Sequence, residues 1–444
     1  MPHPAFGEKP YPQFGTDGAR GTADTFTADF NFAVGLAAGN HFADAGDTMY
    51  LTGDTRASSA RIMQQVGAGL TAAGVSVAYV DTMPTPGLMY TTAQGERAAG
   101  GIMVTASHNP AQDNGVKIVN GGGEKLDDAT QHEITKLIVD GAPERAGGSI
   151  GFDAGARGRY EDFLVETAAG EDMGGLHIAI DTAHGAASGI AERVFTRLGA
   201  NVLPLFDTPN GLNINQECGA THTAPLQARV AAANGKLVGA ALDGDADRLM
   251  MVDERGNLLT GDHILYILAK TQGLTKVVAT SMTNMGAERA MAHSDPAIQL
   301  IRTDVGDRYV LEGMYAEDAL LGGEQSGHII MRQFLHAGDG LLAAIQTMRA
   351  VHDSGKPLSW WYDQVPMFDQ SLVNIPLANR DLLQHPDVRA FDAAVAEEFG
   401  TNGRLLLRPS GTEPLLRVMV ESDDAHAKAE RIAGKLQALL ASLR

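Results

Sequence analysis

Short apolar runs alternate with helix-like segments along most of the chain. Residues 48–54 (TMYLTGD) form one such run, and Ile62, Val66 and Leu70 follow it with a spacing of four residues. A short apolar run predicts a buried strand, and the four-residue spacing predicts one face of a helix. The alternation recurs in two further rounds. Strands that alternate with helices in this way are typical of α/β layers built on parallel or mixed sheets.

The last part of the chain has a different pattern. Residues 403–421 (GRLLLRPSGTEPLLRVMVE) predict two strands around a loop, and the helix that follows has Asp423 as its expected N-cap. The apolar residues of that helix repeat along one face, at Ala429, Ile432, Leu436, Leu439, Leu440 and Leu443. We therefore expect a small α+β unit at this end.

The length of the chain and its glycine-rich or turn-like segments indicate several domains. A chain of 444 residues exceeds the size at which a single core keeps growing, so two to four domains are expected. Residues 142–158 are rich in glycine and poor in apolar side chains, which is typical of a linker. Further breaks are expected at 353–361 and, more weakly, near a hairpin turn at 254–257.

The composition excludes several classes of partner. A net charge of −20 disfavours nucleic acid, whose phosphates are held by clustered Lys and Arg. An anionic small substrate would need basic groups gathered at its own site. No apolar stretch approaches the roughly 20 residues that span a bilayer, and no signal peptide is visible, so we expect a cytoplasmic protein with no membrane partner. The single cysteine, Cys218, excludes an internal disulfide and a cysteine metal cluster.

Three aspartates alternate in the stretch LDGDADR, which follows the apolar run 237–242. In an extended segment Asp243, Asp245 and Asp247 point to the same side. Three convergent carboxylates repel one another unless a cation holds them, and ligation by oxygen alone suits Mg²⁺. A solvated acidic turn is the simpler alternative. An EF-hand calcium loop is excluded, because its sixth position needs glycine and holds Arg248 here.

The stretch GGEQSGHI offers several polar groups after another apolar run. Glu324, Ser326 and His328 alternate and would present an acceptor, a hydroxyl and an imidazole to one side. Such a row suits the vicinal hydroxyls of a sugar. A structural role explains this loop equally well when it is taken alone.

The stretch RPSGTEP combines a cation with hydroxyls and a glycine. Arg408, the hydroxyls of Ser410 and Thr412, and the N–H groups around Gly411 can form a phosphate cradle, to which Arg417 could add charge. A plain hairpin turn would explain the glycine and the proline, but not the arginine together with two hydroxyls. These are the local basic groups that an acidic chain needs for an anionic substrate.

The stretch TASHNP places a serine beside a histidine after the apolar run 101–104. Ser107 is a poor acyl-transfer nucleophile, because on an extended chain the neighbouring His108 faces away from it and no G-x-S-x-G elbow surrounds it. A serine that carries phosphate fits better, with Mg²⁺ on the aspartates and a second phosphate on the arginine loop. The usual alternative for a serine before Asn-Pro is a helix N-cap.

Taken together and in this order, TASHNP, LDGDADR, GGEQSGH and RPSGTEP resemble the motifs of the phosphohexomutase family over nearly the whole chain. FGTDGARG, GLNINQECGATH, VGDRYVLEG and Gln325 resemble the branch that acts on glucosamine phosphates. The resemblance implies three α/β domains with mixed sheets flanked by helices, plus a smaller C-terminal α+β domain, around a central cleft. The expected domains are 1–155, 156–256, 257–365 and 366–444.

The resemblance also implies roles for individual residues. Ser107 would carry the phosphoryl group, and its phosphate oxygen would bind one Mg²⁺ per subunit together with the three aspartates. Lys117, in DNGVKIV, resembles the family's general acid/base, and Arg20 would line the reacting phosphate. The residues expected to contact the substrate are Arg248, Glu324, Ser326, His328, Arg408, Ser410, Gly411, Thr412 and Arg417.

The implied activity is the interconversion of glucosamine 6-phosphate and glucosamine 1-phosphate through a phosphoserine enzyme and glucosamine 1,6-bisphosphate. This intramolecular phosphoryl transfer would feed the synthesis of amino-sugar nucleotides and cell-wall precursors. A phosphomannomutase/phosphoglucomutase would share all four loops and differ in its sugar preference. A non-catalytic metal- or sugar-phosphate-binding module would keep the carboxylates but would not need Ser107. The expected partner is a small sugar phosphate, with the chain a monomer or a homodimer.

Overall fold

The computed structural model describes residues 11–15, 18–44, 46–410 and 414–443. Contacts divide them into two compact units. The larger unit holds the described residues up to Met282 together with Ser294–Gln364, and the smaller unit holds Thr283–His293 and the described residues from Val365 onward. The described helices include none that is long and apolar enough to cross a membrane.

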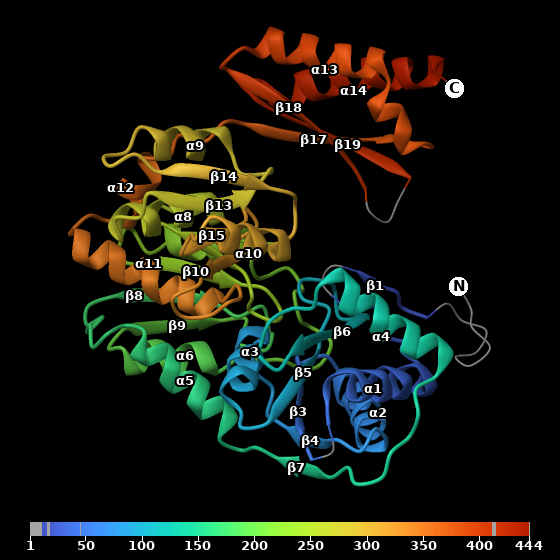
Figure 1. The fold of residues 1–444 in the computed structure, drawn as a ribbon. Coiled ribbons are helices and arrows are strands. Elements are labelled where there is room, and N and C mark those ends of the chain that lie inside the picture. Colours follow the sequence, from blue (N-terminus) through green and yellow to red (C-terminus); the bar gives the residue numbers. More distant parts are fainter. Residues whose placement is uncertain (1–10, 16–17, 45, 411–413, 444) are drawn as a thin grey trace. The chain divides into compact units, whose positions relative to one another are not determined.

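A seven-stranded mixed sheet, in the order β1-β2-β6-β5-β3-β4-β7, forms the first α/β layer. Its strands are β1 (Phe14–Gly15), β2 (Gly18–Thr22), β3 (Thr48–Gly53), β4 (Ser76–Tyr79), β5 (Ala98–Val104), β6 (Asp113–Asn120) and β7 (Ile150–Phe152). Its helices are α1 (Ala28–Phe42), α2 (Ser59–Ala72), α3 (Thr85–Gln94) and α4 (Asp128–Asp140). Figure 1 shows α1, α2 and α4 on one side of the sheet and α3 on the other.

The core of this layer follows the sequence pattern. Ile62, Val66 and Leu70 of α2 are fully buried and pack in one cluster with the apolar residues of α1 and the sheet, as their spacing predicts. The stretch expected as a linker is shorter than predicted, because residues 150–152 pair in parallel with β4 as the edge strand β7. Glycine content alone does not reveal that pairing.

A five-stranded sheet, in the order β12-β11-β10-β8-β9, forms the second layer. Its strands are β8 (His177–Asp181), β9 (Asn201–Leu205), β10 (Val238–Leu242), β11 (Leu249–Val252) and β12 (Leu258–Leu259). Its helices are α5 (Ala156–Glu166), α6 (Ile190–Arg197) and α7 (Ala224–Ala231). The expected hairpin is confirmed, since β11 and β12 pair antiparallel around the turn at 253–257. This sheet places the aspartate stretch directly after β10.

A four-stranded sheet, in the order β14-β13-β15-β16, forms the third layer. Its strands are β13 (Lys276–Thr280), β14 (Gln299–Thr303), β15 (Leu321–Gly323) and β16 (Ile329–Met331). Its helices are α8 (Gly261–Thr271), α10 (Asp307–Ala316), α11 (Gly340–Ser354) and α12 (Leu358–Asp363). β15 and β16 are antiparallel neighbours, so the stretch GGEQSGHI turns between them.

The smaller unit is an α+β layer with a three-stranded antiparallel sheet in the order β17-β19-β18, as expected. Its strands are β17 (Gln370–Pro376), β18 (Gly403–Pro409) and β19 (Leu415–Ser422). Its helices are α9 (Met285–Ala292), α13 (Pro386–Phe399) and α14 (Ala425–Ser442), with a short 3₁₀ helix at Arg380–Gln384.

Two details of the smaller unit differ from the expectation. The N-cap of α14 is Asp424, in the left-handed region with φ 57°, and not Asp423. The Asp423 carboxylate accepts a hydrogen bond of 2.8 Å from Lys428 instead. Helix α9, inside the segment expected for the third domain, belongs to this unit, and Asn284 at its N-cap donates a hydrogen bond of 3.0 Å to the carbonyl of Phe368.

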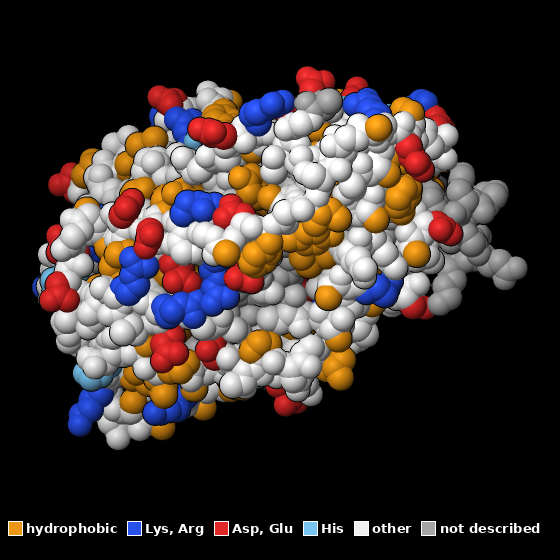
Figure 2. Space-filling view, turned by 90° about the horizontal axis from the view of Figure 1, so that it is seen from below, with side chains coloured by type: hydrophobic (Ala, Val, Ile, Leu, Met, Phe, Trp, Pro, Cys, Tyr) orange, Lys and Arg blue, Asp and Glu red, His pale blue; other side chains and the backbone are white. Residues whose placement is uncertain are grey.

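Basic side chains of the second layer lie beside acidic ones. Arg193 of α6 pairs with Glu161 of α5 at 2.5 Å, and Arg197 pairs with Asp162 at 2.7 Å. Figure 2 shows Lys and Arg next to Asp and Glu on the face that it presents. Arg193 and Arg197 of α6 are therefore each paired with a carboxylate of α5.

Candidate active site

Ser107 lies in a tight loop that joins β5 to β6. The side chain of Thr105 starts the turn, accepting a hydrogen bond of 3.0 Å from the Ser107 N–H and donating one of 2.7 Å to Asp54. Ser107 itself has φ 51° and is buried. No helix follows it, because the chain turns directly into β6 at Asp113, so the N-cap alternative is excluded.

The Ser107 hydroxyl is the point at which two layers meet. Its Oγ donates a hydrogen bond of 2.7 Å to Oδ2 of Asp243, and the Nδ1 atom of His108 lies 3.2 Å from the same Oγ. The expectation that His108 faces away is wrong. It assumed an extended chain, whereas the left-handed backbone at Ser107 turns the next side chain back towards the hydroxyl.

Asp243, Asp245 and Asp247 converge, as predicted, with ligand atoms within 4.8 Å of one another and all three side chains buried. The path that brings them together is a turn and not an extended strand. Ala246 has φ 55°, and the Ala246 N–H bonds to the carbonyl of Asp243 at 3.0 Å. The solvated acidic turn is thereby excluded for this stretch.

Lys117, on β6, faces two of these carboxylates. Its Nζ lies 2.7 Å from Oδ2 of Asp245 and 3.2 Å from Oδ2 of Asp247. Thr85, at the start of α3, donates a hydrogen bond of 2.5 Å to the same oxygen of Asp245. Neither the position of Thr85 nor its hydroxyl gave a signal in the sequence, because the contact spans two layers.

The two outer aspartates differ in electrostatics. Burial raises the pKa of Asp243 well above its ordinary value, and repulsion from Asp247 and Asp245 adds to that rise. Burial also opposes the charge of Asp247, but the ammonium of Lys117 and the imidazole of His328 outweigh it and hold the pKa of Asp247 well below its ordinary value. The negative charge of Asp243 is therefore less well stabilised than that of Asp247.

The donor set fits a hard divalent cation. Oδ1 of Asp245 and Oδ1 of Asp247 are buried and accept no hydrogen bond, although buried polar atoms are normally satisfied. Three carboxylates against the single ammonium of Lys117 leave an excess of negative charge that such a cation would offset. Oxygen-only donors of this kind match the preference of Mg²⁺.

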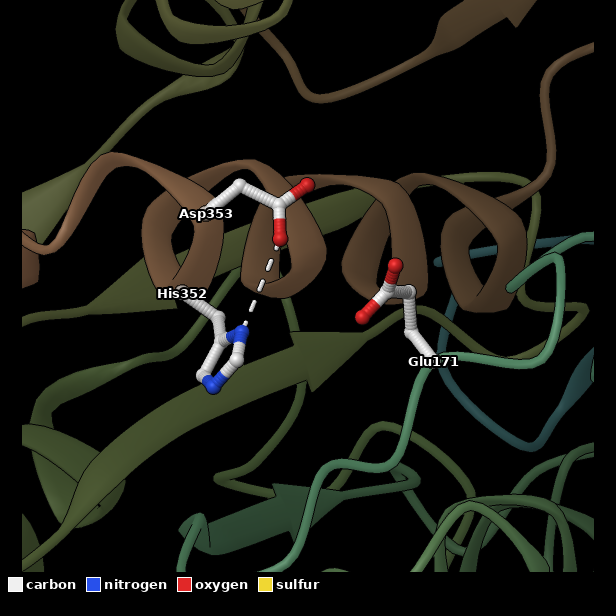
Figure 3. Close-up of side chains that lie close together, drawn as sticks. All are labelled: Glu171, His352 and Asp353. Carbon is white, nitrogen blue, oxygen red and sulfur yellow. Dashed lines mark ion pairs between the residues drawn. The ribbon is translucent and has the colours of Figure 1, made fainter.

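A second acidic group among the described residues is less suited to hold a metal. Glu171, His352 and Asp353 also bring ligand atoms within 4.8 Å, but all three are exposed. Figure 3 shows His352 and Asp353 on one helix with Glu171 opposite them, and the 3.6 Å ion pair between His352 and Asp353 marked. An exposed ion pair of this kind is solvated without a metal.

Two arginines surround the histidine of the serine loop. Burial, together with the charges of Arg248 and Arg20, lowers the pKa of His108 to about 4. The Arg248 N–H donates a hydrogen bond of 3.2 Å to Asp243, and the Arg248 guanidinium lies 4.0 Å from Asp247. Arg20 and Arg248 are thus brought together with the serine and aspartate loops, as expected.

The residues of GGEQSGHI do not form a single row. Ser326 Oγ donates to Oε2 of Glu324 at 3.3 Å, so these two share one side. His328 is buried elsewhere, with Nδ1 3.8 Å from Asp247 and Nε2 3.3 Å from Asp307. Burial lowers the pKa of His328, but Asp307 and Asp247 outweigh this effect and raise it. The turn between β15 and β16 replaces the extended segment that the expectation assumed.

The arginine hairpin is built from β18 and β19 in the smaller unit. Arg408 and Arg417 are directly opposite partners in the antiparallel ladder, and Ser410 is buried beside them. Arg380 donates a hydrogen bond to the carbonyl of Ser410, a third cation that the sequence motif did not reveal. Gly411 and Thr412 lie outside the described residues. Like charges on facing positions are unfavourable unless an anion binds them.

Four segments of the chain match the domains of one family. Residues 12–144, 159–256 and 260–368 match the domains described as phosphoglucomutase/phosphomannomutase, alpha/beta/alpha domain I, domain II and domain III. Residues 372–438 match the phosphoglucomutase/phosphomannomutase C-terminal domain. The chain therefore belongs to this family, and the resemblance to phosphohexomutases is confirmed.

Curated relatives narrow the comparison. The phosphoglucosamine mutase of Alcanivorax borkumensis is 42% identical over 424 residues, covering 93% of this chain and 94% of that protein. The phosphoglucosamine mutase of Thermus thermophilus is 40% identical over 433 residues, covering 96% and 98%. The expected class of enzyme, a mutase of the isomerase class, is confirmed by these relatives.

Solved structures support the fold. A phosphoglucomutase/phosphomannomutase family protein from Burkholderia thailandensis superposes with a TM-score of 0.80 at 24% identity, covering 97% of each chain. The Aspergillus fumigatus N-acetylphosphoglucosamine mutase, solved in complex with GlcNAc-6P and magnesium, gives 0.66 at 19% identity, covering 97% of this chain and 96% of that one. At these identities the likeness concerns the fold alone.

Proposed function

We propose that this chain interconverts glucosamine 6-phosphate and glucosamine 1-phosphate, with Ser107 as the phosphoryl carrier and glucosamine 1,6-bisphosphate as the intermediate. The observation that carries the proposal is the 2.7 Å hydrogen bond from the Ser107 hydroxyl to Asp243 inside the buried carboxylate group. A serine held there is next to a group of buried carboxylates that fits a hard cation. The relatives named phosphoglucosamine mutase direct the choice of sugar.

The proposed reaction consists of two phosphoryl transfers. The phosphoryl group leaves Oγ of phospho-Ser107 for the C1 oxygen of glucosamine 6-phosphate, and the proton of the C1 hydroxyl passes to Oγ of Ser107. After the bisphosphate has turned round, its C6 phosphoryl group returns to Oγ of Ser107, and the proton of the Ser107 hydroxyl passes to the C6 oxygen. Lys117, with Nζ 2.7 Å from Asp245, is the proposed group that exchanges these protons. Positioning and charge neutralisation supply most of the rate in such transfers.

Asp243, Asp245 and Asp247 would hold one Mg²⁺ per subunit, together with the phosphate of Ser107. The cation would supply charge neutralisation for the transferring group. Arg20 and Arg248 are proposed to contact the reacting phosphate, because their charges already act on His108 beside Ser107.

The remaining site residues are proposed to bind the substrate. Glu324 and Ser326, which share one side of their turn, would contact sugar hydroxyls, and His328 would support them. The arginine hairpin would hold the phosphate that is not reacting, through Arg408, Ser410, Gly411, Thr412 and Arg417. The facing charges of Arg408 and Arg417 support an anion at this hairpin.

Several coarser expectations accompany this function as proposals. The domain boundaries are kept at 1–155, 156–256, 257–365 and 366–444, with the predicted central cleft. The partner is a sugar phosphate, the subunits act as monomers or homodimers, and the reaction takes place in the cytoplasm. A product of this kind would be consumed by reactions that make amino-sugar nucleotides.

A coupled assay that compares glucosamine, glucose and mannose 6-phosphates tests the proposal. We expect kcat/KM to be highest for glucosamine 6-phosphate, and intact mass to show one added phosphate on part of the purified protein. A preference for mannose or glucose phosphate would favour the phosphomannomutase/phosphoglucomutase alternative. No turnover with any of the three sugars, and no phosphate on Ser107 after incubation with a hexose 1,6-bisphosphate, would contradict it.

A further inference from the structure

Two backbone carbonyls of the serine loop are held by two side chains in a crossed pattern. Nη2 of Arg56 donates hydrogen bonds of 3.0 Å to the carbonyl of Ser107 and 2.8 Å to that of Asn109. Nδ2 of Asn215 donates to the same two carbonyls, at 2.8 Å and 2.9 Å. Each carbonyl thus accepts from both donors, and we call this arrangement the loop clamp.

Arg56 belongs to the same layer as the serine. Its guanidinium pairs with Asp54 at 2.8 Å, both side chains are fully buried, and its Nη1 donates to the carbonyls of Pro110 and Asp113. Asp54 also accepts the hydrogen bond from Thr105 that starts the turn. Arg56 therefore fixes the shape of the loop from within the first layer.

Asn215 belongs to the second layer and lies in the stretch GLNINQECGATH. The reaction proposed above assigns no role to the residues of this stretch. Asn215 has φ 59°, a region that asparagine tolerates better than most residues, and its N–H bonds to the carbonyl of Ala183 at 2.9 Å. Buried Asp181 anchors the same stretch, accepting 2.7 Å from the Gly219 N–H. These hydrogen bonds fix the backbone that positions the side-chain amide of Asn215.

The second layer therefore contacts residue 107 at both of its ends. Asp243 accepts from the side-chain hydroxyl, and Asn215 donates to the main-chain carbonyl. The backbone of Gly244 is packed against the same carbonyl, since a Cβ added at Gly244 would lie 2.5 Å from that oxygen. Two contacts on either side of one residue determine its rotation as well as its position.

We propose that Asn215 and Arg56 are positioning residues that hold Ser107 in register with the three aspartates, so that domain II aligns the phosphoryl carrier of domain I. The inference rests on the proposed function. Ser107 has a left-handed backbone, which an unrestrained loop leaves readily. Without the clamp the protein still folds, but Oγ of Ser107 is no longer aligned with Asp243. Phosphoryl transfer is therefore slowed.

The test uses Asn215→Gly and Asn215→Asp in the full-length protein. Glycine keeps the left-handed backbone and removes only the amide, whereas aspartate keeps the shape and replaces two N–H donors by an acceptor that faces two carbonyls. Asn213→Ala is the matched control, because the Asn213 side chain lies in the same stretch and bonds to the nearby residues Thr208 and Asn210, and not to the serine loop, among the described residues. Measurements are kcat, KM, the melting temperature, and the rate at which a hexose 1,6-bisphosphate phosphorylates Ser107, read by intact mass.

We expect Asn215→Gly to lower kcat and the phosphorylation rate on the order of 10²-fold, the cost of misplacing a reacting group by about 1 Å. KM should change little, Asn215→Asp should be slower still, and Asn213→Ala should match the wild type. Arg56→Lys keeps the charge beside Asp54. If this variant folds, it should also show a lower kcat and a lower phosphorylation rate with little change in KM.

Wild-type rates in Asn215→Gly would overturn the inference, as would a rise in KM with kcat unchanged. A fall in melting temperature with normal phosphorylation of the folded fraction would also overturn it. If the wild type itself neither turns over sugar phosphates nor accepts phosphate on Ser107, the proposed function fails, and that result is distinct from failure of the clamp.

Discussion

The serine–aspartate region of the larger unit and the arginine hairpin of the smaller unit treat charge in opposite ways. Around Ser107 the three aspartates are buried and are partly balanced by Lys117, whose ammonium lies 2.7 Å from Asp245. In the hairpin, Arg408 and Arg417 face each other across the ladder, and Arg380 binds the carbonyl of Ser410. The first region gathers buried carboxylates that Lys117 balances in part, and the second gathers arginines.

The difference teaches what each region needs from its ligand. The aspartate region is pre-organised by contacts from three layers, with Lys117, Asp243 and His328 each supplied by a different sheet. The arrangement of its carboxylates suits one small, hard cation. The hairpin has two like charges in register, an arrangement that a bound anion such as the proposed phosphate would stabilise.

The largest effect is expected when the carrier itself is removed. Ser107→Ala should lower kcat on the order of 10⁴-fold, by analogy with removal of other covalent nucleophiles, and should leave melting unchanged. Ser149→Ala, at an exposed serine whose hydroxyl donates a hydrogen bond to Ser76, is the control for loss of a hydroxyl. Near-normal turnover with no phosphate on the protein would end the phosphoserine hypothesis.

The aspartate region should respond next most strongly. Asp245→Asn removes one of the carboxylates that face Lys117 and should weaken Mg²⁺ binding at least about 10-fold, with a lower rate. Calorimetric titration of Mg²⁺ gives a readout independent of activity. Glu171→Gln, in the exposed acidic group of Figure 3, should leave the titration unchanged. If Glu171→Gln weakens Mg²⁺ binding while Asp245→Asn does not, the metal binds at the exposed group and not at the three aspartates.

The hairpin should respond through geometry more than charge. Arg408→Lys keeps the charge but loses the forked contact, which costs about 1.5–3 kcal/mol, or roughly 10- to 150-fold in kcat/KM, in both directions. The bisphosphate should also escape more often per turnover, measured by its release into solution. Arg431→Lys, in an exposed pair with Glu398, is the control. Unchanged bisphosphate release would show that the hairpin does not hold the intermediate.

The smallest effect is expected on the free energy of unfolding. It tests directly whether the hairpin, unlike the aspartate region, is stabilised by an anion. Arg417→Gln removes one of two facing like charges, so without anions the free energy of unfolding should rise by about 0.2–1 kcal/mol. Added inorganic phosphate should stabilise the wild type more than this variant and reverse the order. Thermal melts with and without phosphate measure both. A variant that is less stable than the wild type in the absence of phosphate would remove the evidence for an anion site.

Much of the fold could be predicted from local pattern. The alternation of apolar runs and helix-spaced residues predicted the α/β layers, the hairpin at 253–257 and the α+β end, because each pattern reports one element and its buried face. The edge strand β7 and the placement of α9 could not be predicted in this way. Both depend on pairing or packing with residues far along the chain.

The four loops were identified from the sequence because residue type alone limits their chemistry. Convergent carboxylates, a serine after a buried strand and an arginine beside hydroxyls each suggest a ligand before any coordinates are known. The orientation of side chains within the loops was predicted less well. Extended geometry was assumed at Ser107 and at His328, and the chain turns at both places.

Residue order and local pattern were thus enough to indicate the family, the order of the layers and the residue types at the site. Only the tertiary structure decided that Lys117 and Thr85 face Asp245, that His328 points to Asp247 and Asp307, and that Asn215 holds the loop of Ser107. The physical reason is range. Propensity and periodicity act over a few neighbours, whereas these contacts join residues 21 to 160 positions apart, and most of them form only when separate sheets pack together.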